Sequence, residues 1–311
     1  MFRLPIFYYP TTTYWVDDDA LFLAVAKTRF SRYFNIRTSV SPSKTATLFS
    51  NYQSAIDPFL FLRGCSEHED YDLPDHLPID IDFAEIRKLS ERPKKTDEVS
   101  VMIVDYHMPE MSGLELCRVL KNVPIKKILL TGNAHPQDAI RAFNDGIIDY
   151  FIAKDDPKLE SLVINSINQL FRHYFVDLTQ PLFHHIESDN PLPHTDPVFI
   201  DFFNRLCKER DIQEYYLLNK YGDLLLIDSQ KKSFYFVIRS DKALDEFVEL
   251  HQQTSDAVFF VKNIHERKKI PFFGIGKEPS SFPITTWSKY FYSPNVLIGR
   301  EKYYYVIIER Q

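Results

Sequence analysis

The sequence has little cysteine and no apolar run long enough to cross a membrane. Its three cysteines, Cys65, Cys117 and Cys207, are far apart and lack a CxxC spacing, which favours reduced thiols in a cytoplasmic protein. Its longest apolar stretches, such as 147–153, fall short of the roughly 20 residues that a transmembrane helix needs. Residues 1–10 lack the apolar core of a signal peptide, so we expect a cytoplasmic location and no membrane partner.

The chain also lacks an excess of positive charge. Its formal net charge is −6, and an acidic total is not typical of a dedicated nucleic-acid binder. The last third is rich in Phe and Tyr, and we interpret its one basic run, 262–269, as a solvated helix end. The sequence therefore does not predict DNA binding.

What the sequence does contain is the composition of an ordinary globular protein, with 44% hydrophobic and 26% charged residues. Its 311 residues predict two domains. From residue 11 to residue 178, short apolar runs alternate with segments of helical period. The expected strands are 11–16, 35–40, 99–104, 127–130 and 147–153, and the expected helices are 20–34, a stretch from 42, 112–120, 136–144 and 157–178. This order predicts an α/β fold, a parallel five-stranded sheet with helices on both faces.

Two segments interrupt the pattern. We interpret residues 50–96 as an excursion inserted after the second helix, and residues 181–197 as a linker. The linker holds His184, His185 and His194, which we interpret as solvated loop histidines because no cysteine or carboxylate set stands at metal-ligand spacing. The domain boundaries that follow are 1–180 for the first domain and 198–311 for the second.

The second domain is expected to be a smaller α+β domain. Helices are predicted at 198–208, 241–251 and 254–267, and strands at 214–218, 222–228, 233–238, 286–292 and 302–309. Because short turns separate the first three of these strands, we expect an antiparallel sheet.

Polar side chains stand at the carboxyl ends of four predicted parallel strands. They are Asp17 and Asp18, Asp105, Thr131, and Lys154. Taken singly, each residue fits an ordinary structural role, such as a helix cap, a turn residue or a solvated lysine. Together at one edge, the carboxylates suit Mg²⁺, and a carboxylate beside Mg²⁺ can attack a phosphoryl group. Lysine and threonine can contact the phosphoryl oxygens.

At these residues the sequence resembles the receiver domain of two-component response regulators, a CheY-like (βα)5 fold. The resemblance rests on the runs Val16-Asp17-Asp18-Asp19, Asp105-Tyr106-His107-Met108-Pro109-Glu110-Met111-Ser112-Gly113-Leu114-Glu115, Leu130-Thr131-Gly132 and Phe151-Ile152-Ala153-Lys154. It implies that Asp105 accepts phosphate from a histidine kinase or a phosphotransfer protein.

The resemblance also implies roles for the neighbouring residues. Asp17, Asp18 and Asp105 would hold Mg²⁺ together with the backbone carbonyl of His107. Thr131 would be the switch hydroxyl and Lys154 the signalling lysine. Phe151 and Tyr150 both remain candidates for the switch aromatic residue.

Two features depart from the family pattern. The interval between Asp18 and Asp105 is much longer than usual, because the excursion lies within it. The family's Lys-Pro pair is replaced by Lys154-Asp155.

The whole chain is similar to the quorum-sensing response regulators of the Legionella Lqs type, through residues 146–157 and a tail that includes 215–218, 224–228 and 236–239. This resemblance implies a phosphorylated homodimer that acts downstream of histidine kinases. We expect a phosphoacceptor and not an enzyme, with at most hydrolysis of its own aspartyl phosphate. An alternative stays open, in which the second domain is a sensor or enzyme for a nucleotide or another small molecule and the receiver domain gates it.

Overall fold

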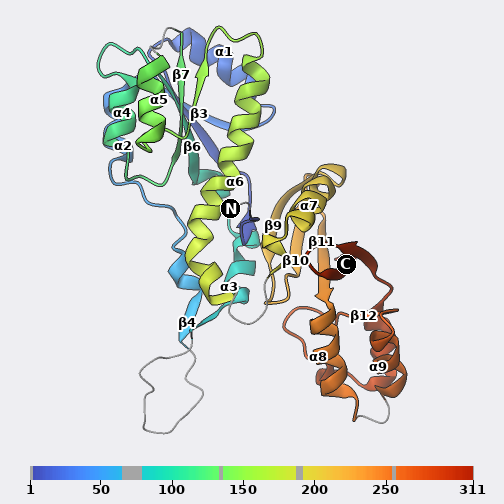
Figure 1. Ribbon diagram of the computed structural model, residues 1–311. Coiled ribbons are helices and arrows are strands. Elements are labelled where there is room, and N and C mark those ends of the chain that lie inside the picture. Colours follow the sequence, from blue (N-terminus) through green and yellow to red (C-terminus); the bar gives the residue numbers. More distant parts are fainter. Residues whose placement is uncertain (1–2, 65–78, 133–135, 187–191, 254–256, 311) are drawn as a thin grey trace, which may run out of the picture. The chain divides into compact units, whose positions relative to one another are not determined.

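The computed structural model describes residues 3–64, 79–132, 136–186, 192–253 and 257–310 (Figure 1). The chain forms two compact units. Residues 9–58 and 92–179 form the unit that we call the parallel unit. Residues 1–8, 59–91 and 180–311 form the unit that we call the antiparallel unit. No helix in the described parts of the chain is both long enough and apolar enough to cross a membrane.

The parallel unit is a five-stranded parallel sheet with the order β3-β2-β6-β7-β8. The strands are β2 (Thr12–Val16), β3 (Asn35–Ser39), β6 (Val99–Asp105), β7 (Lys126–Thr131) and β8 (Tyr150–Ala153). The helices are α1 (Ala20–Phe30), α2 (Pro42–Phe49), α4 (Gly113–Val119), α5 (Pro136–Asn144) and the first part of α6 (Leu159–Ile186). This architecture confirms the predicted α/β fold.

The helices cover both faces of this sheet (Figure 1). On one face, Arg32 just after α1 pairs with Glu160 of α6, with 2.7 Å between Nη2 and Oε1. On the other face α2 packs against α4, and side chains of α2, α4 and α5 share one apolar cluster with the sheet. Strand β6 lies at the centre of the strand order, and all seven of its residues are buried. Its almost continuous run of apolar side chains is what a strand covered on both faces requires.

Short polar residues begin several helices of the parallel unit. Asp19 caps α1 by accepting from the amides of Leu21 and Phe22, and Ser41 caps α2. Ser112 forms a reciprocal capping box with Glu115 at the start of α4. Each cap satisfies amides that have no partner within the helix, so the loops that follow the strands have defined ends.

Helix α6 continues past the predicted linker boundary. It runs through Pro181 to Ile186, so the prediction of a linker starting at residue 181 is wrong. The last turns remain helical because Leu182, Phe183 and Ile186 are buried. His194 is also not a solvated loop residue, since it is 0% exposed. His185 is half-buried on the helix.

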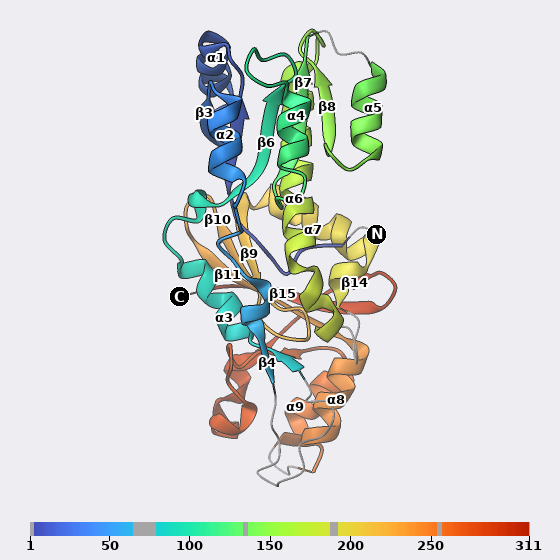
Figure 2. The same ribbon diagram turned by 90° about the vertical axis from the view of Figure 1, so that its left-hand side faces the viewer.

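The antiparallel unit contains a six-stranded sheet with the order β1-β9-β10-β11-β15-β14 (Figure 2). Its strands are β1 (Phe7–Tyr8), β9 (Ile212–Leu217), β10 (Leu224–Asp228), β11 (Ser233–Ser240), β14 (Asn295–Ile298) and β15 (Lys302–Glu309). Its helices are α3 (Phe83–Lys88), α7 (Pro197–Glu209), α8 (Asp241–His251) and α9 (Val258–His265). The short strands β4 (Leu62–Gly64) and β5 (Ile79–Ile81) pair with each other, as do β12 (Ile270–Pro271) and β13 (Phe291–Tyr292).

The sheet of this unit is covered by aromatic side chains. From α7, Phe199 and Phe203 contact Phe236 of β11. A second cluster, which includes Trp287 and Phe272, packs around Val237 of the same strand. Neighbouring residues along a strand point to opposite faces, so Phe236 and Val237 show that both faces are covered.

Two sequence-based expectations differ from the structure in this unit. Residues 1–8 and 59–91 were expected in the first domain, but β1 pairs with β9 and α3 packs on β9. The predicted strand 286–292 is largely a 3₁₀ helix, Ile284–Tyr290, and only Phe291–Tyr292 are extended. Residues 65–78 of the excursion, including Cys65, lie outside the described residues.

Candidate functional site

The carboxyl ends of the parallel strands meet at one edge of the sheet. In the strand register, Val16 of β2 stands beside Val104 of β6, and Thr131 of β7 beside Ala153 of β8. The residues at or just after these positions are the ones singled out in the sequence. The fold therefore brings Asp17, Asp105 and Lys154 together, because parallel strands end on the same side.

Three carboxylates converge at this edge. Asp17, Asp18 and Asp105 each offer an oxygen atom, and these atoms lie within 4.8 Å of one another. Asp17 is 2% exposed and Asp105 is 6% exposed, whereas Asp18 faces solvent. Two buried carboxylates side by side repel each other unless a positive charge lies between them.

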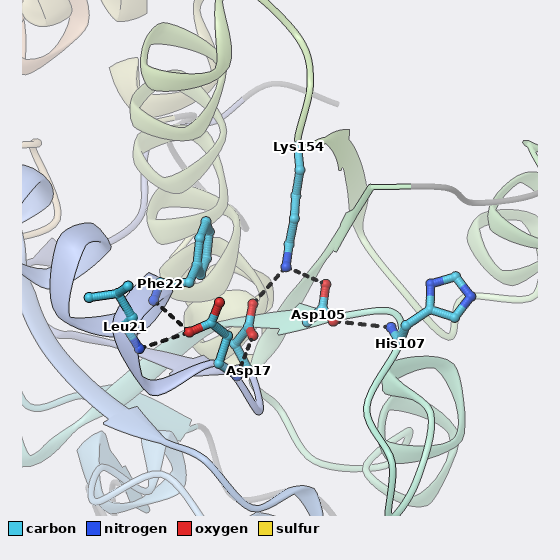
Figure 3. Close-up of polar contacts among 7 residues, drawn as sticks. Asp17, Leu21, Phe22, Asp105, His107 and Lys154 are labelled. Atoms are coloured by element: carbon cyan, nitrogen blue, oxygen red, sulfur yellow. Dashed lines mark hydrogen bonds and ion pairs between the residues drawn. The ribbon is translucent and has the colours of Figure 1, made fainter.

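Lys154 supplies one positive charge. Its Nζ lies 2.8 Å from Oδ2 of Asp17 and 2.7 Å from Oδ1 of Asp105 (Figure 3). The other oxygen of each carboxylate accepts from a backbone amide. Asp19 donates to Oδ1 of Asp17 at 2.9 Å, and His107 donates to Oδ2 of Asp105 at 3.1 Å. Both carboxylates are therefore held in fixed orientations.

Burial and charge act against each other in the pKa values of the site. Burial raises the pKa of Asp17, and the Asp105 charge adds to this, against the lowering by Lys154 and by the Asp19 amide. Burial by itself would lower the pKa of Lys154, but its bonds to Asp105 and Asp17 outweigh burial and raise it. Both directions follow from the same geometry. Lys154 has two carboxylate partners, whereas Asp17 shares one ammonium with Asp105.

The donor set fits a hard divalent cation. Lys154 pairs with two of the three carboxylates, Asp17 and Asp105, so a net negative charge remains at the edge. Carboxylate oxygens are the ligands that Mg²⁺ and Ca²⁺ prefer, and Mg²⁺ commonly takes one or two of them together with water and phosphate oxygen. The acidic cluster predicted from the sequence is thus present in the structure.

The remaining predicted residues lie on, or just after, three strands of the same sheet. Thr131 is buried at the end of β7, and its carbonyl accepts from the Lys154 amide at 2.7 Å. Phe151 is 43% exposed and Tyr150 is half-buried. The side chain of His107 is exposed.

Two residues at the site were not found from the sequence. The Phe22 ring lies over the ammonium of Lys154, with 4.4 Å between Nζ and the ring centroid. Gly113 lies against the main chain of Asp105, and a Cβ atom there would be 1.9 Å from the Asp105 carbonyl oxygen. The glycine belongs to the run 105–115 that resembles the receiver motif, so the sequence shows its position but not its contact. The phenylalanine carries no local signal, because an aromatic residue in a first helical turn is ordinary.

A comparison with known families agrees with this geometry. Residues 81–163 match the response regulator receiver domain. The chain carries a response regulator receiver domain. The matched residues contain Asp105, Thr131 and Lys154, and the structure adds the strands β2 and β3 that precede the excursion. The resemblance stated for the sequence is thereby confirmed.

The likeness extends beyond the receiver domain. The whole chain is similar to the Legionella pneumophila response regulator LqsR, with 27% sequence identity and a TM-score of 0.79, and the comparison covers 99% of this chain and 89% of that chain. A receiver domain of an HD domain-containing protein from Pseudomonas fluorescens is 17% identical, with a TM-score of 0.34 and coverage of 54% and 91%. An adenylate cyclase structure from Rhodopirellula baltica is 18% identical, with a TM-score of 0.37 and coverage of 58% and 99%. Among curated proteins, a comparison finds no match.

Proposed function

We propose that this response regulator accepts a phosphoryl group on Asp105 from a histidine kinase or a phosphotransfer protein. The observation that carries the proposal is the position of Asp105. It ends the central strand β6, its Oδ1 contacts Lys154, and it lies within 4.8 Å of the Asp17 and Asp18 oxygens. A carboxylate held in this way can act as the nucleophile in phosphoryl transfer.

In the proposed reaction, a carboxylate oxygen of Asp105 attacks the phosphorus of a phosphohistidine. The P–N bond breaks, and the imidazole leaves with the electron pair. The product is an acyl phosphate on Asp105. Lys154 is close enough to Asp105 to pair with the new phosphoryl oxygens, and Thr131 lies at the end of the adjacent strand.

Asp17, Asp18 and Asp105, with the backbone carbonyl of His107, are the proposed ligands of Mg²⁺. When bound, this ion would neutralise negative charge on the transferring phosphoryl group. The amides of Asp19 and His107 orient the carboxylates of Asp17 and Asp105, so these oxygens would need little rearrangement to bind the ion.

The output of the protein is proposed to be a change of interaction and not of catalysis. Phosphorylation would draw Thr131 inward, let Phe151 or Tyr150 turn, and change a surface at which two copies associate. Its only activity as an enzyme would be hydrolysis of its own aspartyl phosphate. A role in quorum sensing rests on the resemblance of the whole chain to the Lqs-type regulators. Sensing of a nucleotide or another small molecule by the antiparallel unit stays a prediction from the sequence.

The proposal is tested by exposing the full chain to Mg²⁺ and acetyl phosphate and measuring its intact mass. We expect the mass of one added phosphoryl group, which Asp105→Asn abolishes. Asp97→Asn is the control, because the Asp97 side chain is 55% exposed and pairs with Arg37. Modification that persists in the Asp105→Asn protein would refute the assignment.

A further inference from the structure

The Phe22 ring is the third partner of the Lys154 ammonium. Two partners are the carboxylates of Asp17 and Asp105, at 2.8 and 2.7 Å. The third is the ring, whose centroid is 4.4 Å from Nζ (Figure 3). A cation over an aromatic face is attracted by the negative centre of the ring, and the attraction grows when water is kept away. The side chain of Lys154 is only 25% exposed, so the contact is partly desolvated.

The start of the helix that carries Phe22 is held by the same loop that holds Asp17. Asp19 accepts from the Phe22 amide at 3.0 Å and donates its own amide to Asp17 at 2.9 Å. The Trp15 ring, on the strand that leads to Asp17, lies 6.4 Å from the Phe22 ring, centroid to centroid. The backbone of Phe22 is therefore tied, through Asp19, to the loop that carries Asp17.

We propose that Phe22 is a positioning residue, which holds the Lys154 ammonium against Asp17 and Asp105 and so sets how fast Asp105 accepts a phosphoryl group. The second half of this statement rests on the proposed function. The first half concerns only the resting protein. The ring offers an attraction that an aliphatic side chain of similar size lacks, and this difference makes the proposal testable.

The step that Phe22 affects is the attack by Asp105. With acetyl phosphate, an oxygen of Asp105 bonds to phosphorus, the bond from phosphorus to the acetyl oxygen breaks, and acetate leaves with the electron pair. Negative charge on the phosphoryl oxygens must be balanced throughout. A lysine that leaves its place for part of the time balances this charge less well, so the rate falls.

The first test is spectroscopic and uses the resting chain without metal or phosphoryl donor. The lysines are labelled with carbon-13 at Cε, and the Lys154 signal is identified by its loss in Lys154→Arg. Protons near the face of an aromatic ring resonate upfield, so we expect a displaced Cε proton signal for Lys154. Phe22→Leu should remove the displacement, and Phe22→Tyr should restore it. Phe143→Leu is the control, because Phe143 is 52% exposed on α5. A Lys154 signal that is the same in the wild type and in Phe22→Leu would overturn the proposal.

The second test measures the rate of modification by acetyl phosphate with Mg²⁺. Phe22→Leu should slow it roughly fivefold, which corresponds to about 1 kcal/mol at 1.36 kcal/mol per tenfold. Mono-, di- and trifluorophenylalanine at position 22 should slow it stepwise, because fluorine withdraws charge from the ring face with little change of shape. In a Lys154→Met background, Phe22→Leu should have no further effect. Equal rates across the fluorinated series would refute an effect of the ring on the rate.

The two tests separate the failure of this proposal from the failure of the proposed function. If no phosphoryl donor modifies the wild type, the proposed function fails, and the effect on rate fails with it. The displaced Lys154 signal would then still support the position of the ammonium under the ring. If the wild type is modified normally and the Lys154 signal is not displaced, the proposal about Phe22 fails alone.

Discussion

His194 should make the antiparallel unit sensitive to mild acid. The side chain is 0% exposed, and both ring nitrogens are buried without a hydrogen-bond partner among the described residues. Its ring lies beside that of Phe199, with 5.9 Å between the ring centroids. Burial lowers the pKa of His194 to about 3. The folded protein therefore keeps this imidazole neutral, whereas the unfolded chain protonates it at its ordinary pKa.

The sign and size of the effect follow from these two pKa values. A base whose pKa is lower in the folded state than in the unfolded chain does not change the free energy of unfolding at pH values above its unfolded pKa, here about 6.5. The free energy of unfolding decreases as the pH falls below that value. Between about pH 7.5 and about pH 5, the unfolded chain gains this proton and the folded chain does not. His194 should then reduce the free energy of unfolding by about 2 kcal/mol over this interval.

The two tryptophans allow this unit to be followed in the full chain. Trp287 is buried in the antiparallel unit, and Trp15 is buried in the parallel unit. In a Trp15→Phe background, the emission of Trp287 during urea unfolding reports on the unit that contains His194. We expect the loss of stability between the two pH values to be about 2 kcal/mol smaller in His194→Phe.

The comparison of two pH values cancels any change in baseline stability that the substitution causes. His265→Phe serves as the control, because this histidine is exposed in the same unit and should leave the pH difference unchanged. If the wild type and His194→Phe lose equal stability on acidification, His194 is not held neutral in the folded state and the reasoning is wrong.

Two further predictions concern a buried ion pair in the antiparallel unit and a close backbone contact in the parallel unit. Arg239→Met should cost the antiparallel unit about 3–5 kcal/mol in Trp287-monitored unfolding, because it leaves the buried Asp223, 2.5 Å from Arg239, without its cation. Lys242→Met, at a surface pair, should cost under about 0.5 kcal/mol, and equal losses would contradict the role of burial. Gly113→Ala should cost the parallel unit about 1–3 kcal/mol in Trp15-monitored unfolding and slow phosphorylation, because its Cβ would meet the Asp105 carbonyl at 1.9 Å. Gly132→Ala, where a Cβ has open space, should do neither, and an equal effect of both substitutions would argue against the clash.

Much of the parallel unit could be read from the sequence. The strand 99–104 and the helix 112–120 agree with the structure within two residues at each end, and the helix from 42 begins where predicted, because their signals are local. Apolar runs, capping residues and a proline in a first turn each specify structure within a few positions. The acidic edge was predictable for a related reason. Once parallel strands are inferred, the residues that follow them must meet on one side.

Other features depended on contacts between distant parts of the chain. Phe7 pairs with Tyr216 in the sheet of the antiparallel unit, although two hundred or so residues separate them. A two-residue edge strand has no period to recognise, and only the exposed backbone of its neighbour determines where it pairs. The middle of the excursion, with α3, belongs to the same unit for a similar reason, since α3 packs on β9.

The segment 286–292 shows how tertiary packing can change local structure. Its aromatic residues have high strand propensity, but most of the segment is a 3₁₀ helix that places Trp287 against Phe291 and Phe273. The gain from burying a large ring exceeds a weak local preference for extended backbone.

The sequence by itself determined which residues could form a phosphoacceptor site, because their chemical types and their positions after strands are local properties. Only the tertiary structure decided that Phe22 covers Lys154 and that His194 is shielded from water. Both depend on which side chains from separate segments share one small volume, and the free energy that fixes this comes from packing and desolvation across the fold.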